Sequence, residues 1–151
     1  MSFDPMVTQD VIVSHAKRLG LFDRVHAHEP KSAPGNGLTC AIWADHIGPI
    51  QSSGLDSTSL RVTYSVRLYY PMLKEPQDAI DRTVLAAVAA LMSAYSGDFT
   101  LDDEARHVDL LGAYGVALSS QAGYLDQDKR LFRVFTISLP IIFNDVFEQV
   151  A

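Results

Sequence analysis

The chain has 151 residues and a formal net charge of −6, with 48% hydrophobic and 20% charged residues, a composition typical of one soluble globular domain. A domain of this size buries about 68–70% of the surface that its unfolded chain exposes, so its core needs neither disulfides nor metals. The acidic balance argues against a nucleic-acid-binding surface, and the single cysteine, Cys40, excludes an internal disulfide and suits a reducing cytosol.

The hydropathy of the chain predicts neither a membrane span nor a secretory signal. No apolar run approaches the roughly 20 residues that a membrane-spanning helix needs. The first residues lack the basic and apolar regions of a signal peptide. We therefore expect a protein that is made in the cytoplasm and has no membrane partner.

The first predicted elements are a helix over residues 4–19 and a short strand over residues 22–28. Asp4 suits the N-cap of the helix, and Pro5 suits its first turn. Gly20 is a typical left-handed residue at a helix end, so we expect the helix to stop there.

A projecting hairpin is expected next. A loop over residues 30–37, rich in proline and glycine, leads into a strand over residues 38–47, which Gly48 and Pro49 end or bend. A polar tip over residues 51–57 connects that strand to a longer one over residues 58–71. The length of the second strand predicts that the hairpin extends beyond the compact core.

The long strand TSLRVTYSVRLYYP alternates apolar and polar residues along residues 58–71. Side chains of a strand alternate between its faces, so the pattern predicts an antiparallel sheet that is covered on one side only. The apolar face consists of Leu60, Val62, Tyr64, Val66, Leu68 and Tyr70. The second face, expected to be wet, consists of Ser59, Arg61, Thr63, Ser65, Arg67 and Tyr69.

A second helix is predicted over residues 76–96 because apolar residues recur there at helical spacing. They form one stripe: Ile80, Val84, Ala87, Val88, Leu91, Met92 and Tyr95. The other side carries small or apolar residues where a solvated helix would carry charge: Leu85, Ala86, Ala89 and Ala90. Two interpretations stay open for this side, high helix propensity or a second contact surface with a neighbouring subunit.

The C-terminal third begins with an acidic loop over residues 98–104. Residues 108–118 and 123–128 are expected to form a strand with a glycine bulge at Gly112 or Gly115, followed by a turn. Both glycines thus mark a place where the regular pairing of the strand is interrupted.

The last strand is predicted over residues 131–143, where Pro140 indicates either an edge position or a bend. The tail, residues 144–151, is either a short helix or a flexible arm. The order of elements predicts a single α+β domain over residues 1–151, with an antiparallel or mixed β-sheet of four to six strands and two α-helices packed on one face. Sequential hairpins favour a meander.

The sequence offers little chemistry for catalysis or metal binding. It contains no serine elbow, phosphate loop or dinucleotide fingerprint, and Cys40 lies in an apolar stretch that predicts an inert core thiol. His26 and His28 share one side of a strand, but a zinc site needs at least one further ligand. The acidic run Asp102, Asp103 and Glu104 lacks the ligand spacing of a calcium loop. We predict no enzyme activity and no catalytic, cofactor or metal site.

A contact face is the stronger functional prediction. Arg61 and Arg67 share the second face of the long strand with Tyr69, and arginine and tyrosine are enriched at protein interfaces. A solvated face is the alternative. The tip between the two strands, with Ser53, Leu55 and Asp56, is the other candidate contact surface.

The order and pattern of the elements resemble those of the tail terminator proteins of long-tailed bacteriophages. The matching segments are GLTCAIWADHIGPI, a polar tip, TSLRVTYSVRLYYP, the helix over residues 76–95 and the final strand RLFRVFTISLPIIF. The likeness spans residues 4–143 and rests on order and pattern, with no signature motif. Neighbouring tail-completion and head–tail joining proteins share the same core.

The resemblance implies a structural protein of the virion, located at the tail–head junction and made in the host cytoplasm. Its subunits would form a ring, a hexamer in that family, that caps the tail tube, ends tube polymerisation and meets the head-side connector or neck protein. DNA would pass through the lumen without sequence-specific binding, which suits an acidic chain. The alternatives are another neck, head–tail joining or baseplate subunit, or a small α+β ligand-binding domain or enzyme.

Overall fold

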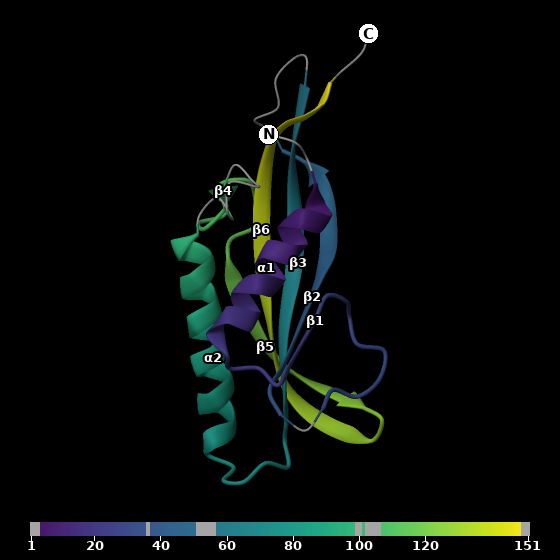
Figure 1. Cartoon of the computed structure of the whole chain (residues 1–151), viewed down its shortest axis with the longest axis vertical. Helices are drawn as coiled ribbons and strands as arrows, with labels where there is room; N and C mark the ends of the chain where they lie inside the picture. The colour runs from purple at the N-terminus through teal and green to yellow at the C-terminus, as the bar shows by residue number, and fades with distance from the viewer. Residues whose placement is uncertain (1–3, 36, 51–56, 99–100, 102–106, 149–151) are drawn as a thin grey trace.

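A computed structural model describes residues 4–35, 37–50, 57–98, 101 and 107–148 of the chain. Two helices and a mixed sheet confirm the predicted α+β class (Figure 1). The elements are α1 (Pro5–Leu19), β1 (Arg24–His26), β2 (Thr39–Pro49), β3 (Ser57–Pro71), α2 (Ala79–Gly97), β4 (His107–Val108), β5 (Ser119–Gln127) and β6 (Arg130–Glu148).

The sheet has the order β1-β2-β3-β6-β4, and β5 also pairs with β6. Among the described strands, β1 and β2 run parallel, and the other pairs are antiparallel. The pairing of β3 with β6 extends from Pro71 opposite Phe132 to Ser57 opposite Glu148. These two strands therefore form the centre of the sheet, and β2 pairs with β3 antiparallel, as the predicted hairpin requires.

Both helices lie on the same face of the sheet (Figure 1). The capping residues of α1 act as predicted, because the Asp4 carboxylate accepts hydrogen bonds from the backbone N–H groups of Met6 at 3.1 Å and Val7 at 3.2 Å. Gly20 ends the helix with a φ of 66°, and its N–H donates to the Lys17 carbonyl. The helix α2 begins at Ala79, three residues later than predicted.

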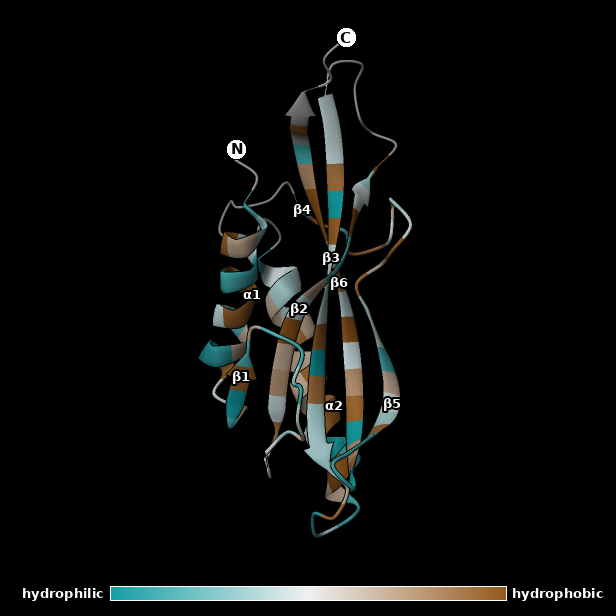
Figure 2. Ribbon diagram, turned by 90° about the vertical axis from the view of Figure 1, so that its right-hand side faces the viewer, coloured by the Kyte–Doolittle hydropathy of each residue, from teal (hydrophilic) through white to brown (hydrophobic). Residues whose placement is uncertain are grey.

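The main core lies between the helices and the apolar face of the sheet. Every second residue contributes to it from Val62 to Leu68 in β3 and from Phe135 to Phe143 in β6. Figure 2 shows the resulting alternation of apolar and polar bands along both strands. The stripe predicted on α2 is confirmed, since Ile80, Val84, Leu91 and Tyr95 are buried. This face of the sheet is the one that the sequence pattern predicted to be covered.

Cys40 is fully buried in this core, and burial raises the pKa of its thiol from 9.0 to about 12. We expect iodoacetamide at pH 8 to alkylate the folded chain about a hundredfold more slowly than the urea-unfolded chain, measured by mass spectrometry. An equally fast reaction of both states would contradict this prediction. Because the unfolded thiol ionises at lower pH than the folded one, stability is full below pH 9 and declines as the pH rises towards 12.

The second face of β3 is covered to a larger extent than predicted. Tyr69 is 2% exposed and packs in a smaller core with Ala41, Phe132 and Val134. Ser59, at 1% exposed, Thr63, at 6%, and Ser65, at 9%, are also buried. The expectation that this face is wet is therefore wrong at these four positions, because segments of the same chain cover it.

Two loops provide this cover. Ala33 packs against the smaller core, and its backbone N–H donates to the Asp128 carboxylate at 2.6 Å, which ties the loop before β2 to the β5–β6 turn. Further along the sheet, the Arg61 guanidinium donates to the carbonyl oxygen of Tyr114, which holds the loop over residues 109–118 against β3. The second face is consequently a surface that the chain itself shapes.

The segment before β5 differs from its prediction. Within the stretch predicted over residues 108–118, Val108 pairs as a strand together with the preceding His107, and residues 109–118 form the loop instead. Gly112 and Gly115 sit in it at φ values of 76° and 111°, which glycine adopts without strain. The predicted glycine bulge is therefore a turn. Likewise, the strand predicted over residues 22–28 is only the three-residue β1.

Pro140 lies in the central strand β6, so the edge interpretation is wrong. On its outer side, β6 pairs with β5 as far as Ser138 and with β4 from Ile141 onward. Pro140 lies between these two stretches, where the backbone N–H that proline lacks is not needed on that side. Its carbonyl oxygen accepts a hydrogen bond from the Asp109 N–H at 3.0 Å.

The start of β3 and the end of β6 run past both helices as a two-stranded ribbon (Figures 1 and 2). Among the described residues, the pairing of β2 with β3 ends at Leu60, and the pairing of β4 with β6 ends at Ile142. Residues 144–148 continue β6, so the helix alternative for this part of the tail is wrong. We call this part, residues 57–59 with residues 144–148, the β3–β6 ribbon.

The helix α2 is, among the described residues, long and apolar enough to cross a membrane by length and composition. The prediction that no apolar run approaches the length of a membrane-spanning helix is therefore wrong for α2, by length and composition. A core helix of a globular domain passes the same test, and the inner side of α2 is buried on the sheet. The absence of a membrane partner stays a prediction.

Candidate interaction surfaces

Arg61 lies on the second face of β3, beside an open groove of about 430 Å³. The groove is lined by Pro49, Ile50, Arg61, Ala113, Tyr114 and Gly115, and we call it the Arg61 groove. The loop that forms one wall is held by Asp109, whose buried carboxylate accepts hydrogen bonds from the N–H groups of Ala113 at 2.8 Å and Tyr114 at 3.0 Å. The wall is therefore fixed by the chain before any partner arrives.

Arg67 lies six residues after Arg61 on the same face of β3. Its Nε donates to the Thr136 hydroxyl at 2.9 Å, and its guanidinium lies over the Trp43 ring at 5.3 Å from the centroid. Arg67 also lines an open groove of about 380 Å³ that β5 borders. The adjacent Tyr69 is buried, and burial raises the pKa of its phenol while Arg67 partly opposes the rise.

The predicted contact residues thus fall in different surroundings. Arg61 and Arg67 are half-buried and each lines a groove on the second face, whereas Tyr69 packs inside the smaller core. Ser53, Leu55 and Asp56 lie outside the described residues. A contact role of all six residues stays a prediction.

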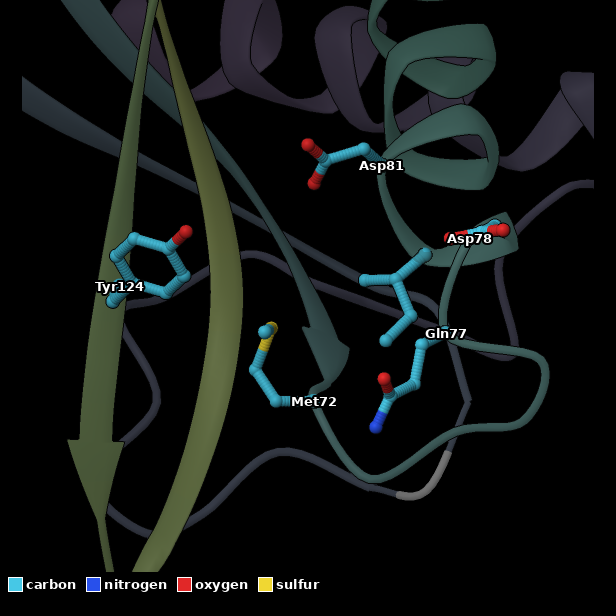
Figure 3. A pocket seen from close by; sticks show the side chains of 6 residues that line it. Met72, Gln77, Asp78, Asp81 and Tyr124 are labelled. Atoms are coloured by element: carbon cyan, nitrogen blue, oxygen red, sulfur yellow. The ribbon is translucent and has the colours of Figure 1, made fainter.

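A third groove, of about 440 Å³, opens at the end of the sheet near the start of α2 (Figure 3). Its walls are formed by Met72, Gln77, Asp78, Ile80, Asp81 and Tyr124. Below Tyr124, the Arg133 guanidinium lies 4.6 Å from the ring centroid and its Nε is 3.0 Å from the Asp81 carboxylate. The sequence pattern does not predict this groove, because its residues come from three separate segments that no local pattern connects.

The outer side of α2 is exposed, as a contact surface with a neighbouring subunit requires. Leu85 is 49% exposed, and Ala86, Ala89, Ser93 and Ser96 are exposed as well. This side carries no charge from Leu85 to Ser96, so it could meet another apolar surface without breaking hydrated ion pairs. High helix propensity explains the same residues, and the choice between the two stays open.

His26 and His15 each lie in a close pair of titratable side chains. The rings of His26 and His28 lie 5.1 Å apart, and burial, then His28 and Arg24, lower the pKa of His26. His15 and Asp98 form an ion pair of 2.7 Å between the two helices, which sequence analysis did not predict. Within the described part of the chain, no three His, Cys, Asp or Glu residues are placed to hold a metal ion.

The fold and these surfaces define an α+β protein with two helices on one side of a mixed sheet and arginine-lined grooves on the other. The chain matches no known family model and no characterised protein. Among solved structures it is similar to the sheath/tube terminator of an extracellular contractile injection system, PVC, in the extended state. The two are 10% identical, with a TM-score of 0.44 over 100% of this chain and 60% of that one.

The chain thus spans about 60% of the length of that terminator. A similarity at this level assigns neither a family nor a function.

Proposed function

We propose that this protein is a structural subunit that resembles a phage tail terminator and acts by assembling with copies of itself. The observation that carries the proposal is the β3–β6 ribbon, which extends past both helices (Figure 1). A ribbon that projects beyond the compact core offers its surface to a neighbouring molecule, and an assembly contact would bury that surface. An enzyme pocket would not need such an extension.

The proposed assembly is a ring of six copies that caps a tail tube, ends its polymerisation and joins it to the head-side connector or neck protein. Each contact is heterologous, so one patch of a subunit meets a different patch of the next. We assign the groove-lining arginines of the second face, Arg61 and Arg67, to one patch. The net charge of −6 supports a lumen wall along which DNA passes without adhering.

Another neck or baseplate subunit would also form a ring and would share the supporting observation. Binding to the end of a tail tube separates the two proposals, because only a terminator stops tube growth. The groove in Figure 3 is where a small ligand would bind if the chain were instead a ligand-binding domain.

We expect light scattering after size-exclusion chromatography to show about six copies of the 16.6 kDa chain, a particle of about 100 kDa. Electron microscopy of tail tubes mixed with the protein should show a ring at one tube end. A chain that stays monomeric at high concentration and binds no tube would contradict the proposal. A ring that ignores tube ends would favour the neck or baseplate alternative.

Charge reversal on the second face provides a variant test of the same proposal. Arg67→Glu should weaken assembly about tenfold or more, whereas Arg18→Glu, at the exposed end of α1, should leave it unchanged. Circular dichroism checks that both variants fold. Equal assembly of both variants would remove Arg67 from the contact.

A further inference from the structure

We propose that the Arg61 groove is a binding site for a carboxylate group supplied by a second copy of this chain. The inference deepens the proposed function and rests on it, because it names the chemistry of one subunit contact. It is carried by the hydrogen-bonding state of Arg61, which differs from that of the other arginine on the same face.

The Arg61 guanidinium is held by one of its ends. Its Nη1 donates to the carbonyl oxygen of Tyr114, whereas its Nε is buried and has no hydrogen-bond partner among the described residues. The edge formed by Nε and Nη2 is the one that can donate two parallel hydrogen bonds to the two oxygens of a carboxylate. Arg67, by contrast, donates from its Nε to Thr136.

A second polar group near Arg61 is also unsatisfied. The hydroxyl of Thr63, two residues along the same face of β3, is buried without a partner in the described part of the chain. Buried polar groups in folded proteins are almost always hydrogen-bonded, because an unpaired one loses its hydration without compensation. The hydroxyls of Thr39 and Ser120 are in the same state elsewhere in the described part of the chain, and Arg61 is the one charged group among the four. The Arg61 guanidinium is therefore the group that an anion from outside the chain would satisfy most strongly.

The groove is already shaped to hold the guanidinium in place. Asp109 uses both carboxylate oxygens on the N–H groups of its own loop, so it fixes the wall and forms no ion pair with Arg61. Gly115 has a φ of 111°, and a Cβ atom there would lie 3.2 Å from Nη1 of Arg61. Glycine at this position lets the loop approach the guanidinium closely.

The charge of the chain points to a carboxylate as the occupant. In the described residues the ion pairs are those of His15 with Asp98 and of Arg133 with Asp81, which leave Arg61 without an acidic partner. The chain has 18 acidic and 12 basic residues, so the surface of a neighbouring copy presents carboxylates in excess. A half-buried arginine recognises a carboxylate more selectively than an exposed lysine does, because its geometry is bidentate.

The test compares the self-association of four full-length chains by sedimentation velocity: the wild type, Arg61→Gln, Arg61→Lys and Arg18→Gln. Arg61→Gln removes the charge, and Arg61→Lys keeps the charge but removes the guanidinium edge that donates two parallel hydrogen bonds. We expect both to weaken association about tenfold or more, and Arg18→Gln, which removes an exposed charge, to leave it unchanged. Thermal unfolding of each variant separates weaker association from a loss of folding.

A second arm identifies the source of the anion. Inorganic phosphate is titrated into the wild-type chain and into Arg61→Gln while the arginine Nε–H resonances are followed by NMR. Under the proposal, the Arg61 resonance shifts on assembly, and phosphate competes with association only in the wild type. Phosphate that binds Arg61 tightly without affecting association would overturn the second copy as the source.

The two proposals fail in different ways. A wild-type chain that assembles and an Arg61→Gln chain that assembles equally well would overturn this inference and leave the proposed function standing. A wild-type chain that never associates would overturn both.

Discussion

Leu91→Ala is expected to lower the free energy of unfolding by about 2–5 kcal/mol. Leu91 is 0% exposed and lies on the inner side of α2, where it packs in the main core against the sheet. Truncation removes buried methyl groups and leaves a cavity that the surrounding strands fill only in part. Urea unfolding followed by circular dichroism measures the loss.

Leu85→Ala is the matched control, since it makes the same change on the opposite side of the same helix. Leu85 is 49% exposed, so its truncation should change the stability of the isolated chain by only about 0.5 kcal/mol. Similar losses for both variants would contradict the assignment of the core to one side of α2. A Leu85→Ala chain that folds normally but assembles weakly would decide in favour of the contact interpretation of the outer side.

Tyr64→Ala is expected to destabilise the chain by about 3–5 kcal/mol, and Tyr64→Phe by about 1 kcal/mol. Tyr64 is fully buried in β3, and its hydroxyl donates to the Pro5 carbonyl at 2.6 Å. The ring fills the core, while the hydroxyl connects the first turn of α1 to the sheet. Loss of the ring therefore removes much more stability than loss of the hydroxyl.

Tyr70→Phe is the control for the hydroxyl, because Tyr70 follows on the same face of the same strand and is half-buried. It should leave stability nearly unchanged, and hydrogen exchange should show faster opening of α1 only in Tyr64→Phe. Burial, and then the nearby Asp4 carboxylate, raise the pKa of Tyr64 above 10.0. The stability from this tyrosine is full below pH 10 and declines above it, a decline that Tyr64→Phe should reduce.

The local patterns of the sequence determined the elements of the main core. Asp4, Gly20 and the alternation along residues 58–71 predicted the start and end of α1 and the covered face of β3 correctly. The helical stripe did the same for the inner side of α2. These features depend on capping and on side-chain periodicity, which act between residues close in the chain.

Only the tertiary structure decided what covers the second face of the sheet. Alternation tells which side a residue such as Tyr69 or Arg61 faces, but not which distant segment lies over it. Ala33 and Tyr114, which are far from β3 in the chain, supply that cover. The glycine-rich stretch around Gly115 became a loop over Arg61 and not a strand because contacts with β3, and not its own composition, place it. Burial by distant segments is a property of packing, so the state of Arg61 could not be derived from residues near it in the sequence.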